Sequence, residues 1–127
     1  MANVTLMQDW ITIQTSGAST VIQNEEQWLD MADFLDLSIQ ISTQNISGTS
    51  PVLSFKTSPS KDEALFQTMS SATFALTSSS NPAPVVVKYA SAAVPLARYV
   101  RWELSGTGVT ATFRIYVAGT TQGAILR

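Results

Sequence analysis

Apolar and polar side chains alternate without a break in residues 109–117, which read Val-Thr-Ala-Thr-Phe-Arg-Ile-Tyr-Val. Successive side chains of a β-strand point to opposite faces, so this period of two predicts a half-buried strand. Arg114 and Tyr116 are then expected on the outer face of that strand. The inner face is expected to consist of Val109, Ala111, Phe113, Ile115 and Val117.

The same period of two recurs in other parts of the chain. It predicts strong strands at residues 34–43 and 97–104, and weaker ones at 10–15, 20–23, 51–57, 72–76 and 85–89. Helical patterns are confined to residues 25–33 and 62–70, and each is long enough for only one or two turns. We therefore expect one domain over residues 1–127, an all-β, jelly-roll-like antiparallel β-sandwich of about eight strands.

Two glycine-containing segments are expected to reverse the chain direction. Residues 47–51 (Ser-Gly-Thr-Ser-Pro) carry turn-forming residues, and residues 105–108 (Ser-Gly-Thr-Gly) are expected to join the last two strong strands as a β-hairpin. In such a hairpin Arg101 and Arg114 oppose each other on the outer face, and Glu103 lies close enough to bridge them.

These outward-facing side chains allow two interpretations. The first is a cross-strand ladder of ion pairs that stabilises the sheet. The second is a basic patch that recognises a carboxylate on another subunit. In the second interpretation the interface residues are Arg101, Arg114 and Tyr116.

The residues that are missing exclude several kinds of chemistry. The chain has no histidine and no cysteine, which removes the commonest general base, thiol nucleophiles, disulfides and cysteine-based metal sites. Asp30, Asp33 and Asp36 form the one dense carboxylate cluster, but their spacing does not match an EF-hand loop, and solvent-facing positions are the favoured interpretation. We expect a protein that is not an enzyme and has no cofactor and no metal site.

The surface is expected to be rich in hydroxyl groups and poor in charge. Charged residues make up 13% of the chain, which also contains 16 serines and 15 threonines. Seven Lys and Arg residues and a net charge of −2 argue against nucleic acid as a partner. No signal peptide and no apolar run of bilayer length is visible, so we expect a protein that is made in the host cytoplasm and does not bind a membrane.

The charges are unevenly divided along the chain. Residues 1–63 hold eight acids and two bases, a net charge of −6, whereas residues 64–127 hold one acid and five bases, a net charge of +4. Strands from the two halves can neutralise each other within one sandwich, which is the favoured interpretation. Alternatively, two faces of opposite charge dock onto neighbouring copies or onto another shell protein.

Two aromatic residues are candidates for stacking against a sugar ring. Trp28 lies beside an expected loop, and Tyr116 lies on the outer face of a strand. Packing within the fold is the favoured interpretation for Trp28. For Tyr116, contact with a ligand or a partner is as well supported as packing.

Two stretches resemble a known family. Residues 97–102 (Ala-Arg-Tyr-Val-Arg-Trp), followed by a final strand, resemble the closing strands of discoidin-type, galactose-binding-like jelly rolls. Residues 35–43 and 52–58, with Ser47 and Gly48 between them, resemble the middle hairpin of that family. The resemblance implies a jelly roll and a lectin-like module. It transfers no individual binding residue, because the family's ligand-reading loops have no match in this chain.

A second resemblance is one of composition and architecture. Small β proteins that lack cysteine and are rich in serine and threonine are similar to accessory virion proteins of tailed phages. This resemblance implies a non-enzymatic structural protein of a virion or phage-like particle, such as a capsid decoration or cement protein or another head or tail accessory subunit. Its expected partners are copies of itself, as a homo-oligomer, and a major shell or tail protein. The alternative is a carbohydrate-binding module that attaches to a cell-surface glycan.

Overall fold

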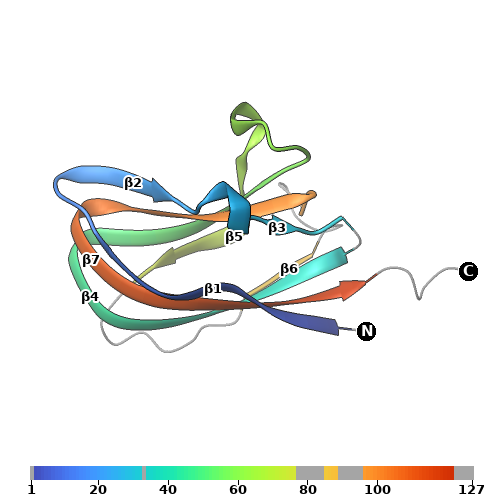
Figure 1. Cartoon of the computed structure of the whole chain (residues 1–127), viewed down its shortest axis with the longest axis horizontal. Coiled ribbons are helices and arrows are strands. Elements are labelled where there is room, and N and C mark those ends of the chain that lie inside the picture. The colour runs from blue at the N-terminus through green and yellow to red at the C-terminus, as the bar shows by residue number, and fades with distance from the viewer. Residues whose placement is uncertain (1, 33, 77–84, 89–95, 122–127) are drawn as a thin grey trace, which may run out of the picture.

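The computed structural model describes residues 2–32, 34–76, 85–88 and 96–121, and it consists almost entirely of β-strands (Figure 1). The strands form one antiparallel hydrogen-bonded sheet, which folds over itself into two facing layers. In chain order the elements are β1 (Ala2–Gln14), β2 (Ala18–Ile22), the 3-10 turn η1 (Glu25–Gln27), β3 (Leu29–Asp30), β4 (Phe34–Ser58), the 3-10 turn η2 (Glu63–Leu65), β5 (Gln67–Ala75), β6 (Val85–Lys88) and β7 (Tyr99–Thr121).

The centre of the fold is a long two-stranded ribbon made of β4 and β7. The two strands pair from Phe34 opposite Thr121 to Ser58 opposite Tyr99. The ribbon bends where residues 47–52 of β4 lie against residues 105–110 of β7, so each strand contributes to both layers (Figure 1). The rings of Trp102 and Phe113 meet edge to face across the core, with centroids 5.1 Å apart, although both residues belong to β7.

The remaining strands widen the two layers. The first layer has the order β1-β7-β4-β6, because β1 pairs with the C-terminal part of β7 and β6 pairs with the N-terminal part of β4. In the second layer, β2 and β3 pair with the N-terminal part of β7, and β5 pairs with the C-terminal part of β4. The predicted all-β antiparallel sandwich is therefore confirmed, with seven strands.

The core follows the predicted alternation. The five residues expected on the inner face of residues 109–117 are at most 3% exposed. Buried apolar side chains from the other half of β7 and from β4 complete the core, among them Val100, Leu104, Leu37, Ile39 and Leu53. Burial of each such side chain contributes about 1.5–3 kcal/mol, so this inner face provides much of the driving force for folding.

The expected turn at residues 47–51 and the expected hairpin at residues 105–108 are both wrong, because each segment lies inside a continuous strand. Gly48 and Gly106 have φ angles of +109° and +147°, which let the ribbon bend sharply without ending. As a result, Arg101 and Arg114 lie on the outer faces of different layers and do not oppose each other.

Two smaller expectations also need correction. The helices expected at residues 25–33 and 62–70 are single 3-10 turns, each capped by the side chain of the preceding residue, Asn24 or Asp62. The strand expected to begin at residue 10 begins at Ala2. Register shifts between Leu6 and Ile11 interrupt the period of two there, so the alternation does not reveal the first half of β1.

The bend predicts a specific sensitivity to substitution. A Cβ atom at Gly48 would lie 2.7 Å from the carbonyl oxygen of Gly108, whereas a Cβ at Gly17, also at positive φ, meets nothing within 4 Å. We expect Gly48→Ala to lower the free energy of unfolding by about 2–4 kcal/mol and Gly17→Ala by only about 1–2 kcal/mol. Urea unfolding of both variants measures the difference, and equal losses would show that the close backbone contact is not needed.

Candidate interaction surface

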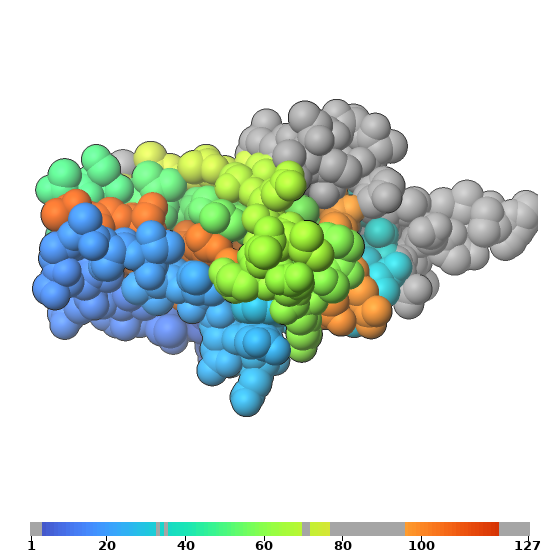
Figure 2. Space-filling model, turned by 90° about the horizontal axis from the view of Figure 1, so that it is seen from above, coloured from blue at the N-terminus to red at the C-terminus, as the bar shows by residue number. Residues whose placement is uncertain are grey.

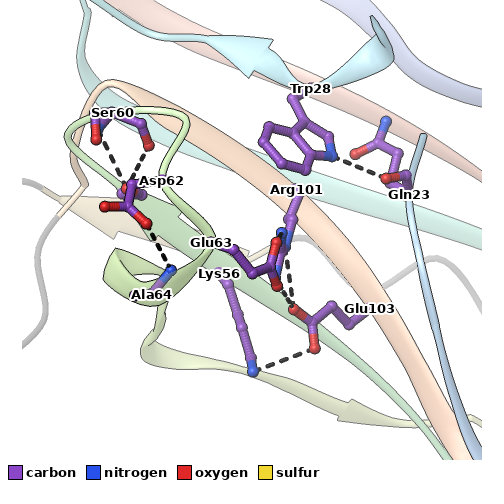
Figure 3. A network of polar contacts seen from close by, with 10 residues as sticks. Gln23, Trp28, Lys56, Ser60, Asp62, Glu63, Ala64, Arg101 and Glu103 are labelled. Atoms are coloured by element: carbon purple, nitrogen blue, oxygen red, sulfur yellow. Dashed lines mark hydrogen bonds and ion pairs between the residues drawn. The ribbon is translucent and has the colours of Figure 1, made fainter. Parts of the chain in front are cut away.

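Arg101 lies on the outer face of the second layer, yet its side chain is only 2% exposed. Two nitrogens of its guanidinium donate to the two carboxylate oxygens of Glu63, at 2.6 and 2.7 Å. The Nε and Nη2 groups of Arg101 also donate to Glu103 Oε2, at 3.1 and 2.8 Å (Figure 3). The guanidinium therefore binds two carboxylates of its own chain.

An aromatic cover closes over this ion-pair cluster. The guanidinium carbon of Arg101 lies 4.0 Å from the ring centroid of Phe66 and 5.0 Å from that of Trp28. The two rings contact each other edge to face at 4.9 Å, and the indole N–H of Trp28 donates to the carbonyl of Gln23 at 2.8 Å. In Figure 2 the segment around η2, in lime green, lies beside orange atoms of β7, and its Glu63 and Phe66 contact Arg101 near the start of that strand.

Both carboxylates of the cluster form ion pairs with basic side chains. Glu103 is 6% exposed, and Lys56 Nζ approaches its second oxygen at 3.2 Å. Hydrogen bonds from Arg101 hold the pKa of Glu63 below its ordinary value, and the same bonds raise the pKa of Arg101. Each charge therefore has an opposite charge beside it, as the burial of ions requires.

Arg101 was predicted as an exposed interface residue, but its own chain encloses its side chain. The predicted proximity of Glu103 to Arg101 is confirmed, whereas Arg114 takes no part in this cluster. Trp28 packs within the cluster, in agreement with the favoured interpretation. Because Trp28 and Tyr116 lie over different layers, they do not form one platform for a sugar ring.

The uneven charge along the sequence is partly neutralised inside the fold. Asp30 of the acidic half pairs with Arg98 of the basic half at 3.1 Å, and Glu63 pairs with Arg101. Lys56 and Glu103 also join the two halves, but their pair does not reduce the difference in charge. The first two pairs favour mutual neutralisation over oppositely charged docking faces. Among the residues that the structure describes, no three carboxylates come close enough to hold a metal ion, and Asp33 lies outside them.

The outer face of the first layer, in contrast, exposes large apolar side chains. Leu6 lies opposite Tyr116 and Val4 opposite Ala118, so these residues share one face. Val4 is 72%, Leu6 41%, Trp10 40% and Tyr116 37% exposed. Together with Arg114 they form what we call the outer-face patch. Exposed apolar groups gathered on one face are typical of interaction surfaces.

Arg114 lies between two aromatic rings of this patch. Its guanidinium carbon is 4.8 Å from the ring centroid of Trp10 and 4.9 Å from that of Tyr116. The register shift between Gln8 and Ile11 brings Trp10 alongside Arg114. Within the described part of the chain, the buried Nε of Arg114 has no hydrogen-bond partner. The sequence identified Arg114 and Tyr116 and placed Trp10 at the start of a predicted strand. It gave no signal for Val4 and Leu6, because the bulges hide the first half of β1.

A surface hollow at the start of β2 does not resemble a sugar site. Its volume is about 380 Å³, and it is lined by Ala18, Ser19, Thr20, Ser105, Gly106 and Thr107. This lining contains no aromatic ring on which a sugar could stack. No helix among the described residues is long and apolar enough to cross a membrane.

Comparisons with known proteins extend to the fold alone. No protein-family model matches the chain, and no curated protein matches it significantly. The structure is similar to a chain in the structure of infectious bursal disease virus Gx strain, with a TM-score of 0.55 and 12% identity over 97% of this chain and 32% of that chain. This chain therefore spans about a third of that viral one. A chain from disulfide-linked Bacillus endospore appendage pili has a TM-score of 0.45 and 18% identity over 94% of this chain and 91% of that chain. A β-sandwich is consistent with the similarity to the viral chain, and the specific discoidin type is not shown.

The buried cluster predicts that two arginines differ sharply in their contribution to stability. Arg101→Met leaves the buried Glu103 with Lys56 alone, so we expect the free energy of unfolding to fall by about 3–5 kcal/mol. Arg98→Met removes the half-exposed ion pair with Asp30 and is expected to change the free energy of unfolding by less than about 1 kcal/mol. Chemical denaturation tests both variants, and similar losses would contradict the structural role of Arg101.

The lowered pKa of Glu63 predicts a pH dependence. Because the folded state favours the ionised form, the stabilisation from Glu63 is present above the ordinary glutamate pKa of about 4.3 and is lost as the pH falls through the lowered value. The stability difference between the native chain and Glu63→Gln is therefore expected to be constant near neutral pH and to shrink in acid. Denaturation midpoints measured between neutral and acid pH test this, and a difference that stays constant in acid would contradict it.

Proposed function

We propose that the chain is a non-enzymatic structural subunit of a virion or phage-like particle, of the decoration or cement kind. It acts by contacts with copies of itself and with a major shell or tail protein. The observation that carries this proposal is the outer-face patch, in which exposed apolar side chains surround an arginine held between two rings. Aromatic residues and arginine are the residue types most enriched where proteins bind each other.

The surroundings of the patch favour protein contact. The same face carries hydroxyl groups, and the Thr12 and Thr112 side chains hydrogen-bond to each other at 2.8 Å. Neutral groups that already have partners lose less on desolvation than free charges do, so such a face can be buried over a wide area. Arg114 adds a charge that a partner carboxylate or carbonyl can match.

Two further observations support a structural role over catalysis. The chain lacks histidine and cysteine, and the ion pairs that the structure describes bind Arg98 and Arg101 to acids of the same chain. A related fold occurs in a chain of a virus structure, which supports a fold of this kind in a particle. In a symmetric particle, many weak contacts add to a strong attachment.

Replacement of the two aromatic residues tests the patch. We expect the purified chain to form a discrete oligomer and the double variant Trp10→Ser/Tyr116→Ser to associate at least about 30-fold more weakly, as loss of an interface hot spot implies. Ile22→Ser, which removes a similarly exposed apolar side chain from β2, is the matched control and is expected to keep the native mass. Size-exclusion chromatography with light scattering, at low and moderate salt, measures the mass. A double variant that associates as strongly as the native chain would contradict the role of the patch.

A further inference from the structure

We infer that the free edge of β1 pairs with the same edge of a second copy of this chain, antiparallel, about a two-fold axis near Thr5. The inference rests on the proposed function, because it names one of the contacts through which the subunit would assemble. It concerns the edge of the strand and its backbone groups, whereas the outer-face patch concerns the face of the layer.

The position of β1 in the sheet leaves one of its edges open. Within the described residues β1 pairs only with β7, and it stands at the end of the strand order β1-β7-β4-β5. Alternate N–H and C=O groups along this edge therefore face away from the sheet. Such a row of backbone groups is a template to which another extended strand can add.

The composition of β1 lacks the features that usually keep an edge strand from pairing with another chain. Edge strands normally avoid pairing by being short or by carrying charge. The other edge strands that the structure describes, β2, β3, β5 and β6, have five, two, nine and four residues, and β3 contains the ion-paired Asp30, whereas β1 is the longest with 13 residues. Residues 2–8 (Ala-Asn-Val-Thr-Leu-Met-Gln) contain no charge, no proline and no glycine. Val4, at 72%, is the most exposed large apolar residue that the structure describes.

A second copy is the occupant that this edge fits. An axis at Thr5 places Val4 beside Leu6 of the second copy and Leu6 beside Val4 of the second copy, so two exposed apolar pairs are buried together. Because residues 2–8 carry no charge, the strand meets itself without repulsion. The register shifts after Leu6 confine regular pairing to the first part of β1, before the first acid, Asp9.

The geometry of the pair has a consequence for the patch. A two-fold axis perpendicular to the layer keeps the outer faces of both copies on the same side. The Trp10, Arg114 and Tyr116 groups of the two copies would then face the same partner surface, and binding would become bivalent.

Single cysteines test the axis directly, since the chain has none of its own. Val4→Cys, Thr5→Cys and Leu6→Cys would each be oxidised with copper phenanthroline and analysed on non-reducing gels. We expect the disulfide-linked dimer to be most abundant for Thr5→Cys, which lies on the axis. Ile22→Cys, on the edge strand β2, is the matched control and is expected to give several-fold less dimer. Cross-linking that is absent at all three positions, or equal to that of the control, would overturn the inference.

A second variant tests the same edge without oxidation. Val4→Lys places a charge at each apolar pair and brings two lysines close together. We therefore expect the dissociation constant of the dimer to rise at least about tenfold. Val4→Thr keeps a neutral, β-branched strand residue, so its dimer dissociation constant is expected to stay within a few-fold of that of the native chain. An unchanged mass for Val4→Lys, with native circular dichroism, would overturn the pairing.

The two proposals fail separately. An oligomer that is sensitive to Trp10→Ser/Tyr116→Ser but shows neither cross-linking at β1 nor an effect of Val4→Lys would refute the edge pairing and retain the patch. Cross-linking at Thr5→Cys with no effect of the aromatic variants would refute the patch and retain the edge pairing. A monomer at every concentration would overturn the edge pairing.

Discussion

The bend in the β4–β7 ribbon is the constraint on which the rest of the fold depends. Both strands cross from one layer to the other, so the bend brings the rings of Trp102 and Phe113 of one strand together edge to face across the core. Gly48 and Gly106 make the bend possible. A Cβ at Gly48 would lie 2.7 Å from the carbonyl oxygen of Gly108 in the opposite strand, and a Cβ at Gly106 would lie 2.5 Å from Val109 Cγ2 in its own strand. A hydrogen bond from Thr15 N–H to the carbonyl of Val109 continues the bend into the connection between β1 and β2. Loss of the bend would separate the layers and expose both inner faces.

The outer faces of the two layers carry different side chains, so the two sides of the molecule are chemically distinct. On the second layer, residues from η2 and its surroundings cover Arg101, and the carboxylates of Glu63 and Glu103 neutralise it. On the first layer, Arg114 has only the rings of Trp10 and Tyr116 beside it, within the described residues. Two arginines at outward positions in the two halves of β7 thus differ in their surroundings: Arg101 stabilises the fold, and we propose that Arg114 contacts a partner.

Much of the fold could be predicted from the sequence because apolar and polar residues alternate regularly within each half of β7. The hairpin at residues 105–108 was not correctly predicted, because glycines that allow a bend and glycines that form a turn leave the same local pattern. The first half of β1 was missed because bulges break its alternation. The burial of Arg101 depends on Glu63, Phe66 and Trp28, which lie far away in the sequence and acquire their positions only when the layers form. No local signal at residues 97–104 indicates such a cover.

The small number of charges and their pairing together explain how a weakly charged chain can be suited to assembly. Two acids of the first half of the chain meet bases of the second half over the second layer, where Asp30 binds Arg98 and Glu63 binds Arg101. The outer-face patch on the first layer has apolar side chains around a single charge, that of Arg114. In the proposed assembly, association through this patch depends on shape and burial more than on long-range attraction. The open edge of β1 borders this patch, so the proposed backbone pairing and side-chain burial would act at adjacent places on the same side of the molecule.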